Sequence, residues 1–275
     1  MSIIFIGGGN MASALIGGLV AHGQPISHIG VVDIQPEVAQ RLHQRWGIQV
    51  HPTLAHALHD AGTLVLSVKP QQMQAVTEAM PPLATDLRVI SIAAGIGTAL
   101  LSRWLKGHVN IVRVMPNTPA LIQQGTAGLY AMPQVSSEDR LHAQSLMRAV
   151  GSAVWVNQES DLDAVTAVSG SGPAYVFLLM EAMLRAAQEL GLDAATANTL
   201  VLDTVQGAAM LAKAGSDSPT QLRERVTSPG GTTEAALSVL NVACMEQTIG
   251  EAIRAAAQRS RELGARLEQG VGVNN

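Results

Sequence analysis

The sequence predicts an α/β protein with an N-terminal Rossmann-type doubly wound parallel sheet followed by an all-helical dimerisation domain. Three observations predict this class. Short β-rich runs alternate with helical patterns through the first half of the chain. A glycine-rich turn directly follows the first of these runs, and beyond about Asp161 the strands disappear and only helical patterns remain. We therefore expect a Rossmann domain over residues 1–158 and a helical domain over residues 159–275.

The β-rich runs of the first half are almost continuously apolar, which is typical of strands that are buried on both faces of a parallel sheet. We place them at Ile3–Ile6, Gly30–Asp33, Thr63–Val68, Val89–Ala93, Asn110–Val114 and Ala153–Val156. Helical patterns with caps and glycine stops lie between most of them, so the sheet is expected to carry helices on both faces.

Helical patterns follow in the second half at residues 173–190, 194–213, 219–226 and 232–268. The first begins at Pro173, where a missing N–H does no harm, and Gly191 lies just past its end. It is apolar nearly all round, and such a helix must be buried on most sides. The few helices around it cannot enclose it, so we expect a second subunit to cover it in a homodimer, with a higher homo-oligomer of dimers left open.

Composition and charge exclude several classes of protein. Charged residues make up only 14% of the chain and the net charge is −4. There is no basic stripe and no interleaving of basic and aromatic residues, so we expect no nucleic-acid partner. The single cysteine, Cys244, excludes an internal disulfide framework and fits a reducing, cytoplasmic environment.

Neither a membrane span nor a metal site is expected. The most apolar helical pattern carries Glu181, Arg185 and Glu189, which argue against a bilayer span. His56 and His59 share one helix face, but no third ligand accompanies them, so a surface pair is the better interpretation.

The first predicted strand runs into Gly7-Gly8-Gly9-Asn10-Met11-Ala12, a G-x-G-x-x-A motif that opens a helix. Gly7 permits a tight turn, Gly9 lets the backbone approach a pyrophosphate, and Ala12 allows close packing of helix and strand. Asp33 follows the second strand at the spacing of a ribose-binding carboxylate. The motif therefore predicts a dinucleotide site; the alternative is a glycine-rich turn without a ligand.

Asp33 also bears on the choice between NADH and NADPH. A carboxylate at this position accepts hydrogen bonds from ribose hydroxyls and repels a 2′-phosphate. The nearest arginine, Arg41, lies a helix away. Electrostatics thus favour NADH, although the sequence does not settle the preference.

Further loops are expected to border the same dinucleotide site, because ligands of open parallel sheets lie across the carboxyl ends of the strands. Ser67-Val68-Lys69-Pro70 and Ala93-Ala94-Gly95 end two strands, and Arg113-Val114-Met115-Pro116-Asn117-Thr118-Pro119 ends another. Lys69 could be catalytic, but holding the loop or the cofactor is the better interpretation. The two prolines around Asn117 fix the direction of its amide, and we place Asn117 among the cofactor residues.

A second anion site is predicted near the other end of the chain, at Thr227-Ser-Pro-Gly-Gly-Thr-Thr233. Side-by-side glycines at a helix start expose backbone N–H groups, which attract an anion. A plain N-cap after a loop is the alternative.

The segments RVMPNTP, VSGSGPAY and TSPGGTT stand in this order behind an N-terminal G-x-G-x-x-A, and together they resemble pyrroline-5-carboxylate reductase over about residues 3–268. The resemblance implies reduction of 1-pyrroline-5-carboxylate to L-proline by hydride transfer from NADPH or NADH, the last step of proline biosynthesis. It also implies a Rossmann domain and a helical domain that interleaves with its twin in a dimer.

The resemblance also assigns site residues. It implies that the cofactor lies against Ile6, Gly7, Gly8, Gly9, Asn10, Met11, Asp33, Pro36, Ser67, Val68, Lys69, Pro70, Ile92, Ala93 and Ala94. It implies that the substrate lies against Ser228, Gly230, Gly231, Thr232 and Thr233, with Pro229 as the rigid turn between them, and that Thr166 neighbours the reacting centre. Thr166 has no pKa suited to general acid work, so we interpret it as a hydrogen-bond partner of the imine nitrogen or the nicotinamide amide.

The chain departs from the family pattern before the substrate loop, where Ser216 stands in place of a frequent glutamate and Asp217 lies beside it. Two rival functions stay in view. A β-hydroxyacid dehydrogenase would need a lysine in the segment Asp161–Leu190, which has none. A non-catalytic dinucleotide sensor would keep the glycine turn but would have no use for SPGGTT.

Overall fold

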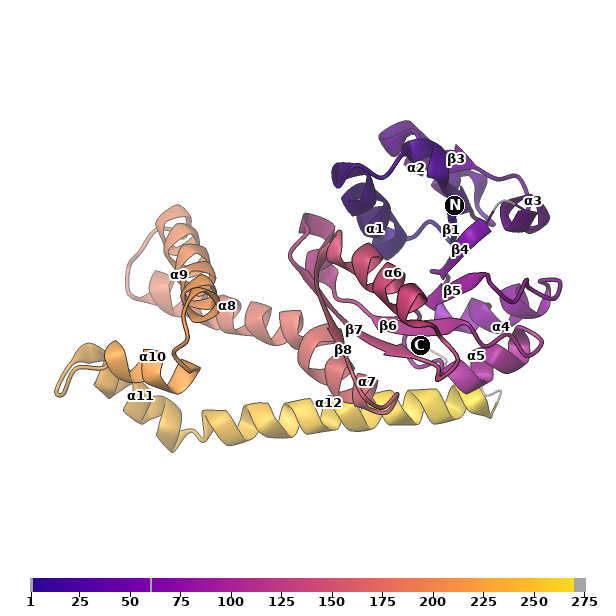
Figure 1. Cartoon of the computed structure of the whole chain (residues 1–275). Helices are drawn as coiled ribbons and strands as arrows, with labels where there is room; N and C mark the ends of the chain where they lie inside the picture. Colours follow the sequence, from indigo (N-terminus) through magenta and orange to yellow (C-terminus); the bar gives the residue numbers. More distant parts are fainter. Residues whose placement is uncertain (1, 60, 270–275) are drawn as a thin grey trace. The chain divides into compact units, whose positions relative to one another are not determined.

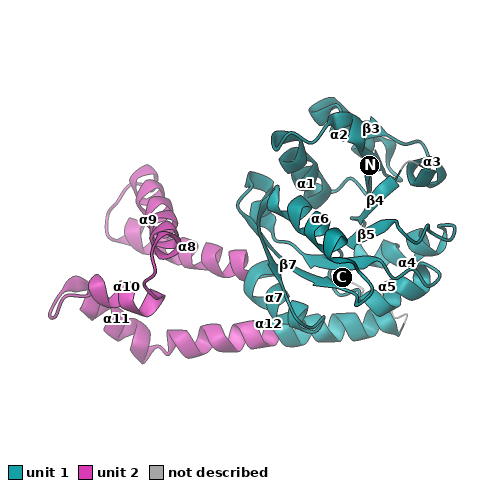
Figure 2. Cartoon of the chain, viewed as in Figure 1, with its two compact units in different colours: residues 1–171, 256–275 teal, residues 172–255 magenta. Residues whose placement is uncertain are grey.

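The computed structural model describes residues 2–59 and 61–269. The chain divides into two compact units, shown in Figure 2. The first comprises residues 1–171 together with 256–275, and the second comprises residues 172–255. The predicted domain boundary at residues 158 and 159 stays a prediction.

The first unit is built on one eight-stranded sheet with the order β3-β2-β1-β4-β5-β6-β7-β8 (Figure 1). The strands are β1 (Ser2–Ile6), β2 (Ile29–Val32), β3 (Gln49–Val50), β4 (Ala61–Leu66), β5 (Arg88–Ser91), β6 (Ile111–Met115), β7 (Gly125–Ala131) and β8 (Gly151–Trp155). All neighbouring pairs are parallel except β6 and β7. The predicted Rossmann-type fold class is confirmed.

Helices cover both faces of this sheet. The helical segments before residue 171 are α1 (Asn10–Ala21), η1 (Ile26–His28), α2 (Pro36–Trp46), α3 (Leu54–His59), α4 (Pro70–Glu78), α5 (Thr98–Trp104), η2 (Thr118–Ile122), α6 (Ser137–Arg148), α7 (Asp161–Val165) and η3 (Thr166–Gly170). Side chains alternate along β1, so Ile3 and Phe5 join one apolar core with α1, α2 and α6. Ile4 and Ile6 join a second core with α3, α4 and α5.

The sequence patterns missed strand β7, which pairs antiparallel with β6. Its sequence, Gly-Thr-Ala-Gly-Leu-Tyr-Ala, holds two glycines and one β-branched residue, so its strand propensity is low. Tertiary packing determines it instead, because Gly128 lies so close to Val165 of α7 that a Cβ would meet its methyl group at 2.7 Å. The two-residue strand β3 was also missed, because so short a run has no detectable alternation.

The second unit contains the helices α8 (Gly172–Glu189), α9 (Ala194–Ala214), α10 (Pro219–Arg225) and α11 (Thr232–Val242), together with the first part of α12 (Met245–Glu268), whose last turns belong to the first unit. The expectation of one helix over residues 232–268 was wrong. Cys244 has a φ of 53°, in the left-handed region, and this residue separates α11 from α12.

Helix α8 exposes its apolar side chains in the single chain. Val176, Phe177, Leu178 and Leu179 are 41–66% exposed. By length and apolarity alone, the stretch Asp161–Glu189 could cross a membrane, with a mean hydropathy of 1.3. One such helix is weak evidence for a span, because apolar helices that pack in protein interfaces share this composition.

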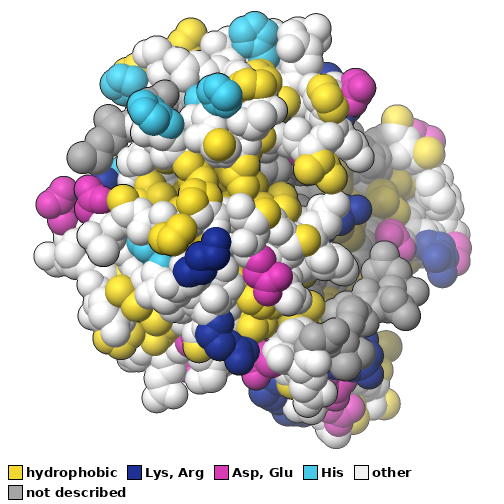
Figure 3. Space-filling view, turned by 90° about the vertical axis from the view of Figure 1, so that its right-hand side faces the viewer, with side chains coloured by type: hydrophobic (Ala, Val, Ile, Leu, Met, Phe, Trp, Pro, Cys, Tyr) yellow, Lys and Arg dark blue, Asp and Glu magenta, His cyan; other side chains and the backbone are white. Residues whose placement is uncertain are grey.

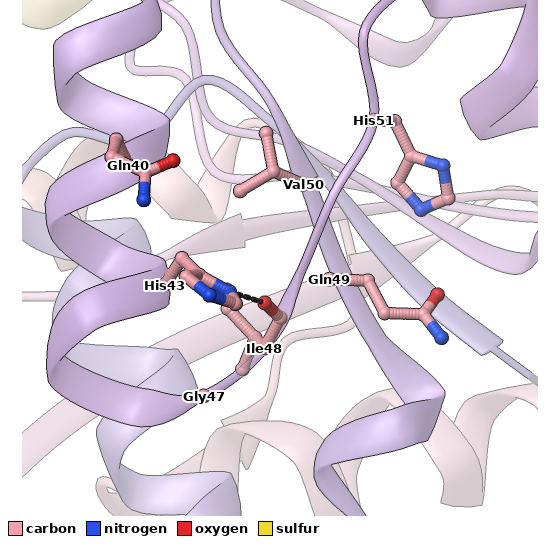
Figure 4. Close-up of a pocket in the computed structure, with 7 residues that line it drawn as sticks. All are labelled: Gln40, His43, Gly47, Ile48, Gln49, Val50 and His51. Carbon is pink, nitrogen blue, oxygen red and sulfur yellow. Dashed lines mark hydrogen bonds between the residues drawn. The ribbon is translucent and has the colours of Figure 1, made fainter.

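The surface of the first unit mixes charges of both signs. On the face shown in Figure 3, lysine and arginine side chains are scattered among acidic ones, and several histidines gather along the upper edge. A pocket beside α2 and β3 is lined by Gln40, His43, Gly47, Ile48, Gln49, Val50 and His51 (Figure 4). One of its polar groups already has a partner within the chain, since His43 Nδ1 lies 2.8 Å from the carbonyl oxygen of Ile48.

Candidate active site

The glycine turn between β1 and α1 is held tightly against the sheet. The N–H of Gly7 donates to the carbonyl of Val32 at 2.9 Å. Gly7 has a φ of 98°, and a Cβ there would meet the carbonyl oxygen of Ser67 at 2.9 Å, so only glycine fits. A Cβ on Gly9 would instead meet no protein atom within 4 Å. Gly9 therefore borders open space at the start of α1, whose first-turn N–H groups can bind a phosphate.

Asp33 lies beside this turn, as the sequence predicted. Its Oδ2 accepts a hydrogen bond from the N–H of Gly8 at 2.7 Å, and its Oδ1 accepts one from the N–H of Gln35 at 2.8 Å. These bonds fix the carboxylate at the carboxyl end of β2. Pro36 follows as the first residue of α2, where its fixed φ favours the helix.

The ends of β4 and β5 lie next to the same turn. Ser67 Oγ donates toward the carbonyl oxygens of Ile6 and Gly7, at 2.9 and 2.7 Å. The N–H of Ile92 donates to the carbonyl of Leu66 at 3.1 Å. Ala93 is buried beside it. The structure thus brings the predicted cofactor residues of β1, β2, β4 and β5 to one edge of the sheet.

Val68 follows Ser67, and Lys69 and Pro70 start helix α4. Lys69 is exposed and caps the helix without a side-chain hydrogen bond. An exposed lysine at this strand end suits an electrostatic role toward a phosphate.

The last turns of α12 pack on the loop Ala93-Ala94-Gly95, a contact that sequence reasoning missed. Gly95 has a φ of 76°, and a Cβ there would lie 3.3 Å from a methyl group of Leu267. A Cβ on Gly264 would lie 3.2 Å from the carbonyl oxygen of Gly95. The two glycines lie 169 positions apart in sequence, and no short-range pattern links them.

Arg113, in the RVMPNTP segment, is engaged in an internal ion pair. Its guanidinium lies 3.0 Å from Glu159 Oε1. The Glu159 carboxylate also accepts hydrogen bonds from the N–H and the hydroxyl of Thr98, both at 2.7 Å. Glu159 thus caps α5 and ties it to β6, and sequence reasoning did not single it out.

Thr166 begins the π-helical turn η3. Its hydroxyl donates to the carbonyl of Leu162 at 2.7 Å, and its own carbonyl accepts from the N–H of Ser171 at 2.8 Å. Short π-helical turns occur often at functional sites. Because the Leu162 carbonyl takes the hydroxyl proton, the lone pairs of Thr166 Oγ1 are left to accept a hydrogen bond.

Asn117, two residues past the end of β6, is joined to this turn by hydrogen bonds. Its Nδ2 donates to the carbonyl oxygen of Ser169 at 3.2 Å and to Ser169 Oγ at 3.1 Å. Its Oδ1 accepts from the N–H of Thr126 at 2.8 Å. The amide that the sequence predicted to contact a cofactor therefore makes three internal hydrogen bonds.

The second predicted anion site, Thr227–Thr233, lies in the second unit. Gly230 has a φ of 73°, the N–H of Gly231 donates to the carbonyl of Ser228 at 3.0 Å, and α11 begins at Thr232. The N–H of Gly230 donates to Glu234 Oε2 at 2.6 Å. Gly230 is therefore already paired, and the first-turn N–H groups of Thr232 and Thr233 are left to bind an anion.

Asp217, beside the departure from the family pattern, pairs with Arg225 at the other end of α10. Their side chains are 26% and 67% exposed, respectively. The ion pair spans α10 directly before the loop that starts at Ser228. Asp217 thus has an intrachain partner that sequence reasoning did not foresee.

The buried and partly buried ionisable groups with shifted pKa values, His108, Asp139 and His142, lie in the first unit and outside the predicted site residues. Burial lowers the pKa of His108 and is the largest cause of the lowered pKa of His142. Burial alone would raise the pKa of Asp139, but hydrogen bonds from Arg88, Ser136 and Asn110 and the charge of Arg88 outweigh it and lower this pKa. Within residues 2–59 and 61–269, no three His, Cys, Asp or Glu side chains cluster as a metal site would require.

The fold and the site define the class of this protein. A Rossmann sheet carries a glycine turn with open space at Gly9, a fixed carboxylate at Asp33 and several loops at the carboxyl ends of its strands. These features are those of a nicotinamide-dinucleotide-dependent oxidoreductase.

Comparison with known proteins identifies the family. Residues 159–263 match the family model for pyrroline-5-carboxylate reductase dimerisation, and residues 2–95 match that for NADP oxidoreductase, coenzyme F420-dependent. The chain is 49% identical to pyrroline-5-carboxylate reductase of Pseudomonas aeruginosa, over 97% of this chain and 98% of that protein. The chain belongs to the pyrroline-5-carboxylate reductase family.

Solved structures of two proteins with this family name match most of the chain. The pyrroline-5-carboxylate reductase of Coxiella burnetii superimposes with a TM-score of 0.88 at 40% identity, covering 95% of this chain and 98% of that one. The Plasmodium falciparum pyrroline carboxylate reductase with NADP bound gives a TM-score of 0.85 at 27% identity, covering 96% and 98%.

Proposed function

We propose that this protein reduces 1-pyrroline-5-carboxylate to L-proline with NADH or NADPH. The observation that carries the proposal is the 49% identity, over nearly the full length of both chains, to an enzyme of this name. The open glycine turn at Gly7–Gly9 and the helix start at Thr232 supply the two anion sites that such a reaction needs, one for the dinucleotide phosphates and one for the substrate carboxylate.

The residues at the carboxyl edge of the sheet fit a nicotinamide dinucleotide. Open space at Gly9 and the α1 amides suit a pyrophosphate, and Asp33 suits ribose hydroxyls. Ile6–Met11, Pro36, Ser67–Pro70 and Ile92–Ala94 complete the proposed cofactor set. When bound, the reduced nicotinamide supplies the hydride that the imine carbon accepts.

The substrate carboxylate is proposed to lie on Ser228, Gly231, Thr232 and Thr233, with Gly230 shaping the turn. Charge-assisted hydrogen bonds contribute about 1.5–3 kcal/mol each, which suffices to orient a small acid. Fixing the ring in this way is the main contribution of the chain, because good orientation of two reactants can remove about 7–11 kcal/mol of a barrier.

Thr166 is proposed to act on the imine nitrogen. Its hydroxyl proton is held by the Leu162 carbonyl, so Oγ1 accepts a hydrogen bond rather than donating one. An acceptor at this position stabilises the protonated imine, which is the better electrophile. The proton itself therefore comes from water or from the already protonated substrate.

The protein is proposed to form a homodimer, with association of dimers into a higher homo-oligomer left open. It is proposed to act in the cytoplasm. The exposed apolar residues of α8 and the dimerisation-family match over residues 159–263 support a partner subunit. The single cysteine supports a reducing compartment.

The test is a complete reaction. Purified protein is mixed with 1-pyrroline-5-carboxylate and either NADH or NADPH, and both nicotinamide absorbance and L-proline are measured. The proposal expects one L-proline for each nicotinamide oxidised. A tight dinucleotide complex without turnover would instead support the sensor alternative, and turnover of a 3-hydroxyacid with NAD⁺ would support the dehydrogenase alternative.

A further inference from the structure

Asn117 and Ser169 connect two parts of the first unit that are 52 positions apart in sequence. Asn117 lies two residues past the end of strand β6 and directly before η2, and Ser169 lies within the π-helical turn η3, three residues after Thr166. The Asn117 amide donates hydrogen bonds to both the carbonyl oxygen and the hydroxyl oxygen of Ser169. A second contact supports the first, because Gly170 lies so close to Met115 that a Cβ there would meet its terminal methyl group at 2.6 Å.

The amide of Asn117 has little capacity left for a ligand. A side-chain amide has two donor hydrogens and two acceptor lone pairs. Nδ2 serves both polar atoms of Ser169, and Oδ1 accepts from Thr126 at the start of β7. The side chain therefore joins the end of β6, the start of β7 and η3 at one point.

A π-helical turn needs such support. Its i→i+5 hydrogen bond, here from Ser171 to Thr166 at 2.8 Å, belongs to a conformation that chains rarely adopt without tertiary constraint. Ser169 is fixed at two atoms, so the turn cannot rotate without breaking both contacts. The orientation of Thr166 Oγ1 depends on the same turn.

We propose that Asn117 is a positioning residue: it fixes the π-helical turn Thr166–Gly170 against the carboxyl end of β6 and thereby sets the direction of Thr166 Oγ1. The part that concerns catalysis rests on the proposed function of Thr166. Displacing a reacting group by about 1 Å can lower turnover about 100-fold, so a small movement of this turn is enough to matter.

The test uses Asn117→Asp. The carboxylate still accepts from the N–H of Thr126 and can accept from the Ser169 hydroxyl, but it cannot donate to the Ser169 carbonyl, so the hydrogen bond that holds the backbone of the turn is lost. We expect kcat to fall about 10- to 100-fold while the dissociation constant of NAD(P)H changes by less than about twofold. Amide hydrogen exchange in residues 166–171 should accelerate at least about tenfold, because the turn loses its anchor.

The matched control is Asn110→Asp. Asn110 lies just before β6 at its other end, and its amide donates to Asp139 Oδ2 at 3.1 Å. The same substitution there should lower thermal stability but leave both kcat and exchange in residues 166–171 unchanged. Should Asn117→Asp fail to fold, Ser169→Ala removes one of the two acceptors, and a smaller loss of kcat with faster exchange is expected.

Three results would overturn the proposal. A higher dissociation constant for NAD(P)H with unchanged kcat and exchange makes Asn117 a direct cofactor ligand. Equal losses of kcat in the variants at residues 117 and 110 make the effect one of general stability. Unchanged exchange in both the Asn117 and Ser169 variants removes the anchor. If the wild-type protein does not reduce 1-pyrroline-5-carboxylate, the proposed function fails, and hydrogen exchange still tests the anchor separately.

Discussion

Thr166 and Thr77 make the same local hydrogen bond in different places. Each hydroxyl donates at 2.7 Å to the carbonyl four residues earlier in a helical segment, Leu162 or Met73. Only Thr166 lies in the turn that we assign to the reacting centre. Substituting each threonine in turn therefore distinguishes an effect on catalysis from the mere loss of this hydrogen bond.

Thr166→Val should lower kcat about 10- to 100-fold, because an isosteric side chain removes the acceptor for the protonated imine at a loss of about 1.5–3 kcal/mol in the transition state. The dissociation constant of NAD(P)H should hardly change. Thr77→Val is the control, with reduced thermal stability and unchanged kcat. Steady-state kinetics with cofactor titration measures both, and unchanged turnover in Thr166→Val would leave Thr166 with a packing role alone.

Asp33→Ser should shift cofactor use toward NADPH. The substitution removes a carboxylate that repels the 2′-phosphate of NADPH. The same carboxylate accepts hydrogen bonds from the ribose hydroxyls of NADH. We expect kcat/KM with NADH to fall about tenfold, the equivalent of one charge-assisted hydrogen bond, and kcat/KM with NADPH to rise. Glu37→Ser, which removes an exposed acid in the first turn of α2, is the charge-matched control. Identical cofactor ratios in wild type and Asp33→Ser would refute the charge argument.

Glu234 lies in the first turn of α11, directly after the proposed substrate loop, and accepts a hydrogen bond from the N–H of Gly230. It orders the loop, but its charge opposes that of the substrate carboxylate. Glu234→Gln keeps an acceptor and removes the charge, so KM for 1-pyrroline-5-carboxylate should fall by up to about fivefold. Glu234→Ala also removes the acceptor, so KM should rise. A change of KM in the same direction in both variants would contradict these separate roles for the charge and the hydrogen-bond acceptor of Glu234.

At the scale of elements, α6 and the sheet are joined by a charged cluster away from the proposed site. Asp139 in α6 pairs with Arg88 at the start of β5 and accepts from Asn110 before β6. Arg88 and Asp139 side chains are each 16% exposed, so solvent screens their interaction only partly. The cluster fixes the ends of two strands, and kinetics should not depend on it directly.

Asp139→Asn should reduce the free energy of unfolding by about 1–3 kcal/mol near neutral pH, because charged hydrogen bonds are lost. The pKa of Asp139 is lowered in the folded state. Its contribution is therefore complete above the ordinary aspartate pKa of about 3.9 and is lost as pH falls through the lower folded value. Denaturant unfolding at several pH values should show the two proteins converging in acid. A constant difference down to the lowest pH would contradict the linkage.

Element by element, the sequence predicts what local chemistry determines. Apolar runs predict most strands, Pro173 and Gly191 predict the limits of α8, and the glycine turn predicts the cofactor edge. Strand β7 could not be predicted, because its local strand propensity is weak and tertiary packing decides it. The break at Cys244 could not be predicted either, because no glycine or proline in the segment Leu240–Glu246 marks it. The bonds of Asn117 to Ser169 were missed for a related reason, since no short-range pattern encodes a contact across 52 positions.

At the scale of the whole molecule, the apolar surface of α8 predicts an association that one substitution should break. Phe177 is 56% exposed in the single chain. Phe177→Arg places a charge in the proposed interface and should raise the dimer dissociation constant at least about 100-fold, or about 2.7 kcal/mol. Leu141→Arg, at a 67% exposed position on α6, is the control. Analytical ultracentrifugation measures the change, and a dimer that tolerates Phe177→Arg would place the interface elsewhere.

The central claim is that one assembly holds a nicotinamide dinucleotide at Gly7–Gly9 and a five-membered ring carboxylate at Ser228–Thr233, with Thr166 beside the reacting atoms. A crystal structure of the assembly with NADP⁺ and L-proline bound tests it most directly. We predict the proline carboxylate on the N–H groups of Thr232 and Thr233, and the ring nitrogen facing Thr166 Oγ1 and the nicotinamide. A structure in which Ser228–Thr233 lies away from the dinucleotide in every subunit would contradict the account.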